Sequence, residues 1–485
     1  MSTLPTWMFL APFLGALLVG IAGWSVRGLA RPVALGAMAL TCGLSVAALL
    51  GTLGGGVLVT HMGGWPPPLG IVWSVDRLGA FMSVVVAFVS GIALFGSRAT
   101  VRAELEGRET GFYACALLLV SGLLGMTATA DLFNFFVHLE VASLSAYALV
   151  AAGGRGAPQA AMRYLIIGSL GASFYLLGVG FLYADMGSLN MRDVAQLLPE
   201  TDGRLGSLGA AFIVVGLAVK MGLFPLHGWM PSAYGRAPFA AGALMAPLVT
   251  KVAAYGLVRI LFWVFGYERL QGGLLLEVLC WAGAAAMVAG AGLAFFQRDL
   301  LRLLAYSSIS QVGLIALGVG LGNVSARTGA VLHIAGDGLM KGVLFLVAGA
   351  LFVRHGLRKV DDLGKLRGRE PLLSATVVVA GLSLVGIPPL VGFFGKWYVL
   401  VGALEAGRTE FAALIVIASL GTVAYVFRIL EKLYFAPRTD TLPPARPGGA
   451  TAMASAAVLA VAVGGLGLAS SVVVQSFLMP AMEVP

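Results

Sequence analysis

Ionisable side chains inside long apolar stretches are the residues most able to do chemistry in this sequence. Five of them lie well within otherwise apolar segments: Glu140, Lys220, Lys251, Lys341 and Lys396. Each charge costs about 2.5–3.5 kcal/mol at the centre of a membrane helix on insertion scales, so five of them require pairing or water. Burial favours the neutral form of a lysine, whereas a nearby carboxylate favours the charged form. A buried lysine therefore gains or loses a proton when a neighbouring charge changes, and this set predicts a route for protons.

Each of the five residues is predicted to have a distinct role along that route. Glu140 and Lys220 form the switch pair, Lys251 is the central relay, and Lys341 with Lys396 leads to the second face of the membrane. For a single Glu–Lys pair, a static ion pair that fixes helix packing is an equally good interpretation. The surplus of four lysines over one glutamate favours a hydrated, functional set.

Further polar residues are candidates to extend the route. His333 lies eight residues before Lys341, about two helical turns away on the same face, and His227 follows a predicted helix break. Asp337, one turn before Lys341, can pair with it. For each histidine, a hydrogen-bonded packing role remains the alternative. The segment AYSSISQVG adds a polar stripe able to order water, formed by Ser307, Ser308 and Gln311.

Two long spans are each interrupted by proline at corresponding positions. One reads GLFPLHGW from Gly222 and contains Pro225; the other reads GIPPLVGF from Gly386 and contains Pro388 and Pro389. Proline cannot donate to the carbonyl four residues earlier, so each break frees a carbonyl able to hold water or a cation. A plain packing kink is the alternative. Paired breaks in two halves of a chain are typical of a transporter's internal repeat and its site.

The composition places these residues in a membrane protein. The 485-residue chain is 59% hydrophobic and 11% charged, and its apolar runs are continuous and reach the length of a spanning helix. The fold class predicted is an all-α integral membrane protein with about fourteen transmembrane helices. Spans are predicted near 5–23, 32–53, 78–97, 111–130, 131–152, 161–185, 207–236, 239–264, 274–296, 300–320, 326–352, 371–405, 411–435 and 450–474.

The spans group into four regions. Residues 1–110 hold the first three helices, with a hairpin or loop cap over the Gly/Pro-rich stretch 54–77. Two five-helix repeats are predicted at 111–264 and 274–435, the second inverted relative to the first, with discontinuous helices 7 and 12. Residues 450–485 hold the fourteenth helix.

The distribution of basic residues predicts orientation. Connections that follow odd-numbered spans, counted together with the adjoining span ends, carry 20 lysines and arginines, whereas those that follow even-numbered spans carry 6. Basic residues accumulate on the cytoplasmic side, so the chain is predicted to be multi-pass in the cell's inner (cytoplasmic) membrane, with both termini on the outer face. The net charge of +9 comes without a basic run interleaved with aromatics, so we expect no nucleic-acid partner.

Other function classes find little support in the sequence. It contains no HExxH motif, no cysteine and histidine set with metal-ligand spacing and no obvious nucleophile–base pair, so we expect no catalytic site, metal or cofactor of its own. A stand-alone solute carrier would need a midplane pocket lined by aromatic and polar side chains. This chain has lysines there instead.

These motifs together resemble the proton-translocating antiporter-like subunits. The resemblance covers about 110–400 and rests on FNFFVHLEVASLSAYALV, VKMGLFPLHGWMPSAYGRAP, APLVTKVAAYGLVR, LLRLLAYSSISQVG, HIAGDGLMKGVLFLVAG and GIPPLVGFFGKWYVL. The sequence is most similar to the D subunit of Mrp-type multisubunit sodium/proton antiporters. Related membrane subunits of respiratory complex I and of energy-converting hydrogenases are the alternative.

The resemblance carries expectations about structure and partners. It implies fourteen helices in two inverted repeats, both termini outside, and other membrane subunits as partners, homologous antiporter-like subunits among them. Protons are the expected cargo, with sodium as a candidate coupling ion and the lipid bilayer as surroundings. The chain departs from the family pattern at Gly336-Asp337, where the family usually has Asn-His. A carboxylate therefore stands in place of a relay histidine.

Overall fold

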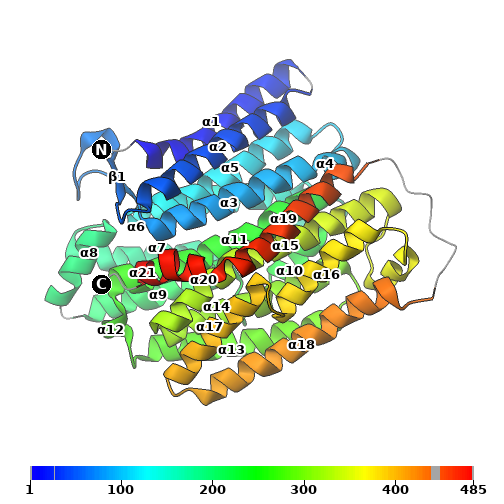
Figure 1. Ribbon diagram of the computed structural model, residues 1–485. Coiled ribbons are helices and arrows are strands. Elements are labelled where there is room, and N and C mark those ends of the chain that lie inside the picture. The colour runs from blue at the N-terminus through cyan, green and yellow to red at the C-terminus, as the bar shows by residue number, and fades with distance from the viewer. Residues whose placement is uncertain (1–2, 27, 202, 438–447, 483–485) are drawn as a thin grey trace.

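The computed structural model describes residues 3–26, 28–201, 203–437 and 448–482. The chain forms one bundle of long helices whose axes are roughly aligned (Figure 1). Within the described residues, 13 helices are long and apolar enough to cross a membrane. They contain α1 (Leu4–Ser25), α2 (Ala30–Thr52), α3 (Arg77–Gly96), α5 (Glu109–Ala128), α6 (Leu132–Ala151), α7 (Ala157–Met186), α9 (Arg204–Met221), α11 (Phe239–Arg259), α13 (Leu274–Phe295), α14 (Leu300–Leu321), α15 (Val324–His355), α18 (Thr409–Tyr434) and α19 (Ala450–Leu468).

Two shorter apolar helices, α16 (Pro371–Val385) and α17 (Val391–Glu405), occupy the segment predicted as the twelfth span. With them, the bundle agrees with the predicted membrane fold of about fourteen helices. The remaining elements are short: α4 (Arg98–Glu104), α8 (Met191–Leu197), η2 (Leu198–Glu200), α10 (Met230–Arg236), η3 (Ile260–Phe265), α12 (Tyr267–Leu270), η4 (Val360–Leu366), α20 (Ser470–Val473), η5 (Val474–Leu478) and α21 (Met479–Met482).

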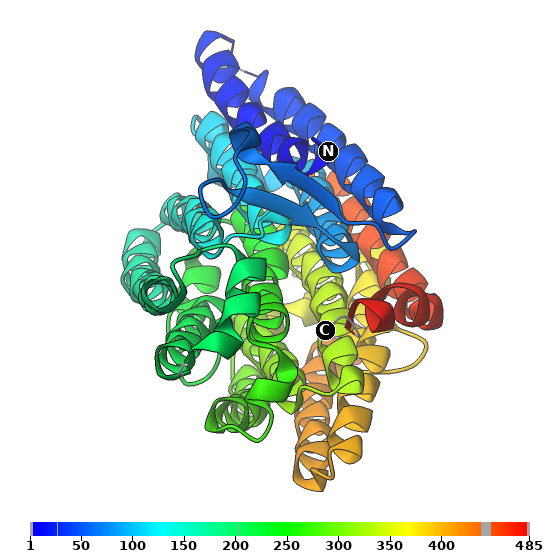
Figure 2. The same ribbon diagram turned by 90° about the vertical axis from the view of Figure 1, so that its left-hand side faces the viewer.

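A small hairpin covers one end of the bundle, as the Gly/Pro-rich stretch 54–77 predicted. Its antiparallel strands are β1 (Leu58–His61) and β2 (Val72–Val75), with the turn η1 (Met62–Gly64) between them. Both ends of the chain lie at this same end of the bundle (Figures 1 and 2). An even number of crossings requires this arrangement.

Side-chain caps fix where several helices begin. Asp131 accepts a hydrogen bond from the Asn134 amide at the start of α6, and Asp299 accepts one from the Arg302 amide at the start of α14. Asn323 does the same for α15. A cap satisfies an amide that the first helical turn leaves unpaired. The helices that carry the site therefore begin at positions set by local sequence.

The centre of the bundle is formed by α11, α14 and α15. In the most apolar stretch of each of these spans, 83%, 94% and 89% of the residues are buried. The corresponding shares are 28% for α2 and 33% for α18. Helices that are apolar all round belong in the interior of a bundle, whereas partly exposed ones lie at its surface. The polar residues predicted as relays lie mostly on these three central helices.

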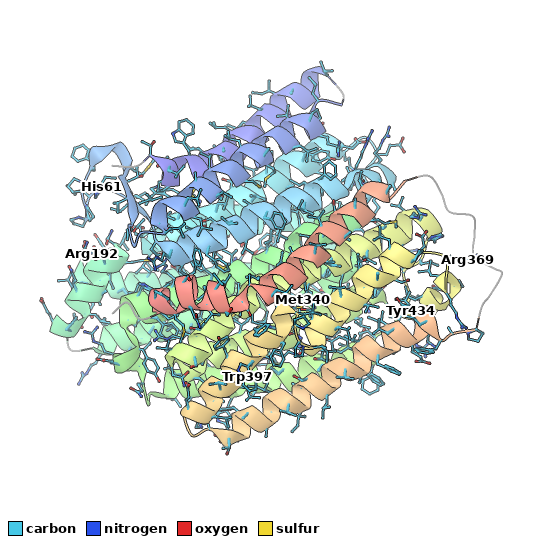
Figure 3. The ribbon with its side chains drawn as sticks, in the orientation of Figure 1. His61, Arg192, Met340, Arg369, Trp397 and Tyr434 are labelled. Carbon is cyan, nitrogen blue, oxygen red and sulfur yellow. The ribbon has the colours of Figure 1, made fainter. Side chains whose placement is uncertain are left out.

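Basic residues of the two kinds of connection lie at opposite ends of the bundle. In Figure 3, Arg192 of an even-numbered connection lies near His61 at the hairpin end, and Arg369 of an odd-numbered connection lies at the other end. Arg27, Arg438 and Arg446, which contribute to the charge count, lie outside the described residues. The inverted relation of the two repeats and the sidedness of the membrane stay predictions.

Candidate functional site

The predicted switch pair is formed. The Lys220 ammonium near the end of α9 lies 2.8 Å from Glu140 Oε1 on α6. It also donates to Ser143 Oγ at 2.8 Å and to Tyr147 OH at 3.4 Å. Glu140, Ser143 and Tyr147 follow a spacing of three and four, which places them on one helix face. Sequence reasoning missed the two hydroxyls, although this spacing from Glu140 was the signal that could have found them.

The two members of this pair differ in exposure. The Lys220 side chain is 5% exposed, whereas the Glu140 side chain is 24% exposed. Glu140 therefore lies near the surface of this chain, and Lys220 lies on the buried side of the pair. A carboxylate in the middle of a span needs a cation, a polar partner or water on each open side.

The first helix break lies directly after Lys220. Gly222, with a φ of 70°, ends α9 in the left-handed conformation that glycine adopts without strain. Regular helix resumes only at Met230 in α10. The Trp229 indole donates to the Val219 carbonyl at 3.0 Å, so part of the open helix end is closed by a side chain. His227 lies in the break with its ring stacked on Phe224, 5.1 Å between centroids.

The second ion pair lies at the centre of the bundle and joins α11 to α15. Lys251 Nζ lies 2.6 Å from Asp337 Oδ2, and the two side chains are 2% and 0% exposed. Lys251 also donates to the Ala246 carbonyl at 2.9 Å. The pairing of Asp337 with Lys341 that the sequence allowed is thus not the one that forms. Although one turn separates those two residues on α15, Asp337 pairs with Lys251 of the neighbouring helix.

Lys341 is fully buried and is held by oxygens of α14. Its ammonium makes a short contact to Ser307 Oγ and donates to the Leu304 carbonyl at 3.2 Å. No carboxylate lies within ion-pair distance of it among the described residues. Ser308 does not contact Lys341 directly; its hydroxyl donates at 3.0 Å to the same Leu304 carbonyl.

His333 and Gln311 form the next contact along α14 and α15. His333 Nε2 lies 2.8 Å from Gln311 Oε1, and the imidazole is fully buried. Gln311 follows Ser307 by four residues, and His333 precedes Asp337 by four, so each helix presents its polar residues on one face. A Cβ on Gly395 would lie 2.7 Å from His333 Nδ1. This glycine lets the histidine lie against α17 beside Lys396.

Lys396 binds the open end of the second helix break. Gly386, with a φ of 95°, ends α16, and Lys396 Nζ donates to the Leu384 and Val385 carbonyls at 2.7 and 2.9 Å. It also lies 3.4 Å from Ser419 Oγ. The break frees the Val385 carbonyl because Pro389 has no amide hydrogen to give it. The freed Val385 carbonyl therefore binds a cation of the chain itself, the Lys396 ammonium.

Aromatic side chains fill the space between the first and second ion pairs. Tyr164 lies 4.5 Å from Tyr147 and is stacked on Trp229 at 4.0 Å, measured between ring centroids. Tyr234 of α10 lies 6.0 Å from Trp229 and within electrostatic reach of Asp337. The Tyr234 hydroxyl and Thr250 Oγ1 are both buried and lie close to each other. Sequence reasoning missed Tyr164 and Tyr234, because no spacing connects them to a lysine.

The polar groups of the interior do not form a metal site. Across the part of the chain that the structure describes, no group of three or more His, Cys, Asp or Glu is arranged to hold a metal ion. The arrangement pairs or solvates four ammonium groups instead, using two carboxylates, hydroxyls and backbone carbonyls. Buried amines with acceptors at hydrogen-bond distance are groups that can hold and release protons.

Known proteins are similar to this chain in both sequence and fold. A family model described as NADH:quinone oxidoreductase/Mrp antiporter, TM matches residues 129–422, more than half of the chain. The chain is 48% identical over 377 residues to NADH-quinone oxidoreductase subunit N of Desulforudis audaxviator, covering 77% of this chain and 75% of that protein. It is 30% identical over 393 residues to the D subunit of the Na(+)/H(+) antiporter of Bacillus subtilis, covering 80% and 78%.

Solved structures give the same result for nearly the whole chain. A chain of the Mrp complex from Dietzia sp. DQ12-45-1b superimposes with a TM-score of 0.90 at 25% identity, covering 99% of this chain and 96% of that one. A chain of the membrane-bound sulfane sulfur reductase, an archaeal respiratory membrane complex, gives 0.91 at 29% identity, covering 99% and 97%. The expected likeness to the D subunit of Mrp antiporters and to membrane subunits of complex I is confirmed. The chain belongs to the NADH:quinone oxidoreductase/Mrp antiporter family of membrane subunits.

Proposed function

We propose that this chain carries protons across the membrane along its buried line of lysines, carboxylates and one histidine. The observation that supports this most is the environment of the lysines. Lys220, Lys251 and Lys341 are 5%, 1% and 0% exposed, yet every one of these ammonium groups has at least two oxygen atoms at hydrogen-bond or ion-pair distance. A buried amine supplied with acceptors can hold a proton and can also release it to the next acceptor.

The order of the contacts suggests an order of transfer. The line begins at Glu140 and Lys220, passes to Lys251 with Asp337, and continues through Lys341 with Ser307. It then reaches Lys396 beside His333. Loss of a proton from one lysine frees its carboxylate to accept another proton, and it frees a hydroxyl oxygen to accept a hydrogen bond from the next donor. The buried hydroxyls of Tyr234 and Thr250 lie in the first gap of the line, where they and water would connect the two ion pairs.

A purely structural role is the competing explanation, and two features count against it. Buried ion pairs add little net stability, because desolvation of both charges offsets their attraction. In addition, Lys341 and Lys396 are not ion-paired within the described residues. A fold that needed only packing at these positions would be served better by apolar side chains of similar size.

We propose further that the chain works inside a multisubunit complex. The partly exposed Glu140, with 24% of its side chain uncovered, favours this, since a neighbouring subunit against α6 would shield its carboxylate from lipid. The relatives named above suggest two drives for proton movement, cation exchange in the antiporter and a redox reaction in the quinone oxidoreductase. The higher identity to the oxidoreductase relative favours the redox-driven complex as the setting. Sodium exchange remains the second candidate.

The orientation proposed is that both termini and the hairpin lie outside, in the cytoplasmic membrane of the cell. The excess of basic residues at the opposite end supports it. Arg369 marks that end in Figure 3.

Proton flux through the intact assembly tests the proposal. Lys220→Ala leaves Glu140 without its cation, so we expect most of the flux to be lost while blue-native gels show the assembly unchanged. Lys359→Ala, at an exposed lysine in a connection, is the matched control and should behave as wild type. Wild-type flux from the Lys220→Ala assembly would show that Lys220 serves packing alone.

A further inference from the structure

Four arginines meet around one hollow at the end of the bundle opposite the hairpin. The pocket has a volume of about 400 Å³, and we call it the arginine pocket. Its lining comes from four separate parts of the chain: the connection before α7, the end of α10, the start of α14 and the connection after α15. The lining residues are Gly154, Arg155, Gly235, Arg236, Asp299, Arg302 and Arg358.

The arginine pocket has a large excess of positive charge. It holds four guanidinium groups and one carboxylate, that of Asp299, whose Oδ1 already accepts the Arg302 amide as the cap of α14. Within the described part of the chain, none of the four arginines forms an ion pair. The excess is a net charge of about +3 facing a single hollow. Clefts lined by one sign of charge concentrate ions of the opposite sign.

Local contacts position three of the four arginines, Arg236, Arg302 and Arg358. The Arg358 guanidinium lies over the Phe239 and Phe352 rings, 5.1 and 5.5 Å from their centroids. Arg302 lies across Gly235, where a Cβ would be 2.8 Å from its Cγ. Arg236 Nη1 reaches the Arg155 carbonyl at 3.4 Å. The side chains are thus partly preorganised by stacking and by a glycine.

The general excess of basic residues at one face explains their number but not their convergence. Arginines that serve orientation alone can spread through open solvent. Here two come from the first predicted repeat and two from the second, and all four line one pocket. Guanidinium groups bind carboxylates and phosphates through paired hydrogen bonds. Four of them around one space suit an oxyanion with more than two oxygens.

We infer that the arginine pocket binds a phosphate group and thereby ties the two halves of the bundle together at this face. The phosphate can belong to a lipid headgroup or to a soluble anion, since both offer the same tetrahedral oxyanion. This site is separate from the proton line, because none of its residues belongs to that line. It would stand even if the proposed function failed.

Binding to the purified assembly that contains the full chain tests the inference. Inorganic phosphate and pyrophosphate are titrated against it by equilibrium dialysis in chloride buffer. In parallel, nanodiscs of phosphatidylcholine with and without phosphatidylglycerol are used, and lipid that remains bound is identified by native mass spectrometry. The first arm detects a soluble anion and the second a lipid headgroup.

Three variants make the test specific. Arg302→Gln removes one guanidinium, and Gly235→Ala displaces Arg302 without any change of charge. Arg102→Gln removes an exposed arginine of α4 that does not line the pocket, so it controls for net charge. Loss of one charged hydrogen-bonding partner corresponds to about a tenfold weaker affinity. We expect that loss for Arg302→Gln, a smaller loss for Gly235→Ala, and none for Arg102→Gln.

Saturable binding in either arm, with the losses of affinity in this order among the variants, supports the site. The arm in which binding occurs identifies the phosphate as that of a soluble anion or of a lipid headgroup. The inference is overturned if neither phosphate probe nor anionic lipid binds saturably. It is also overturned if Arg302→Gln and Arg102→Gln weaken binding equally, because binding would then reflect general charge. Proton flux measured on the same variants should stay near wild type.

Discussion

Replacing Asp337 with asparagine removes the only carboxylate within ion-pair distance of Lys251 among the described residues. The two groups lie 2.6 Å apart and are almost fully buried. Asparagine has nearly the same shape, so packing of α11 against α15 should survive. Lys251 then either stays as an unpaired buried cation or gives up its proton. In both cases it no longer exchanges protons against a partner of opposite charge.

The size of the effect follows from the burial of the pair. Removing one partner of a buried ion pair costs about 3–5 kcal/mol. If the charged form of Lys251 is a step of the route, about 3 kcal/mol of lost stabilisation corresponds to about a hundredfold slower transfer. Asp361→Asn is the matched control. The Asp361 side chain is 56% exposed, and its contact with Arg428 is a long one of 3.9 Å.

Proton flux into vesicles that contain the assembly is the assay, with blue-native gels as the check on assembly. We expect Asp337→Asn to reduce flux by at least tenfold and Asp361→Asn to leave it unchanged. Wild-type flux from an intact Asp337→Asn assembly would refute the reasoning, because the carboxylate would then serve packing alone.

Two further predictions concern groups outside the spans. A cysteine in place of Lys359 should react with a membrane-impermeant reagent only from the cytoplasmic side; reaction from outside alone would reverse the proposed orientation. Glu104 accepts a hydrogen bond from the Phe239 amide at 2.7 Å, and burial raises its pKa to about 7 although that amide and Arg358 favour the ionised form. The folded state then binds more protons than the unfolded state between about pH 4.5 and 7, so stability falls as pH rises through this window. The melting temperature of the wild type should fall relative to Glu104→Gln between pH 5 and 8, and a constant difference would contradict this.

Much of the fold could be predicted because it depends on local sequence. Apolar length fixes the spans, and Gly/Pro content fixes the hairpin over 54–77. The breaks after Gly222 and Gly386 could be predicted because a glycine followed by proline ends a helix through backbone chemistry alone. The segment predicted as one span over 371–405 contains two helices of 15 residues each for the same reason.

The candidate site could be predicted only in part, because a helix face does not reveal which neighbour it meets. Glu140 and Lys220 were the expected pair, since each is the buried charge of its own span. The sequence alone allowed Asp337 to pair with Lys341, one turn along the same helix. The packing of α11 against α15 brings Lys251 nearer, and nothing local in the sequence specifies that contact. Sequence reasoning therefore finds the charged residues but not all of their partners.

The hydroxyls and aromatic residues of the site were missed for a related reason. Tyr147 and Ser143 share a face with Glu140, so helical periodicity contained the information. Tyr234, by contrast, reaches the interior only because α10 turns inward after the break. Its position depends on tertiary structure.

Proton flux in Lys396→Ala and Lys396→Glu assemblies tests most directly whether titratable groups on this line carry the protons. Lys396 is fixed by the Leu384 and Val385 carbonyls at the second break. Alanine removes the carrier, so we expect most of the flux to be lost. A protonated glutamate can donate to one of the carbonyls and exchange its proton, so we expect partial flux. Equal flux in the two intact assemblies, whether near wild type or near zero, would contradict the proposed route.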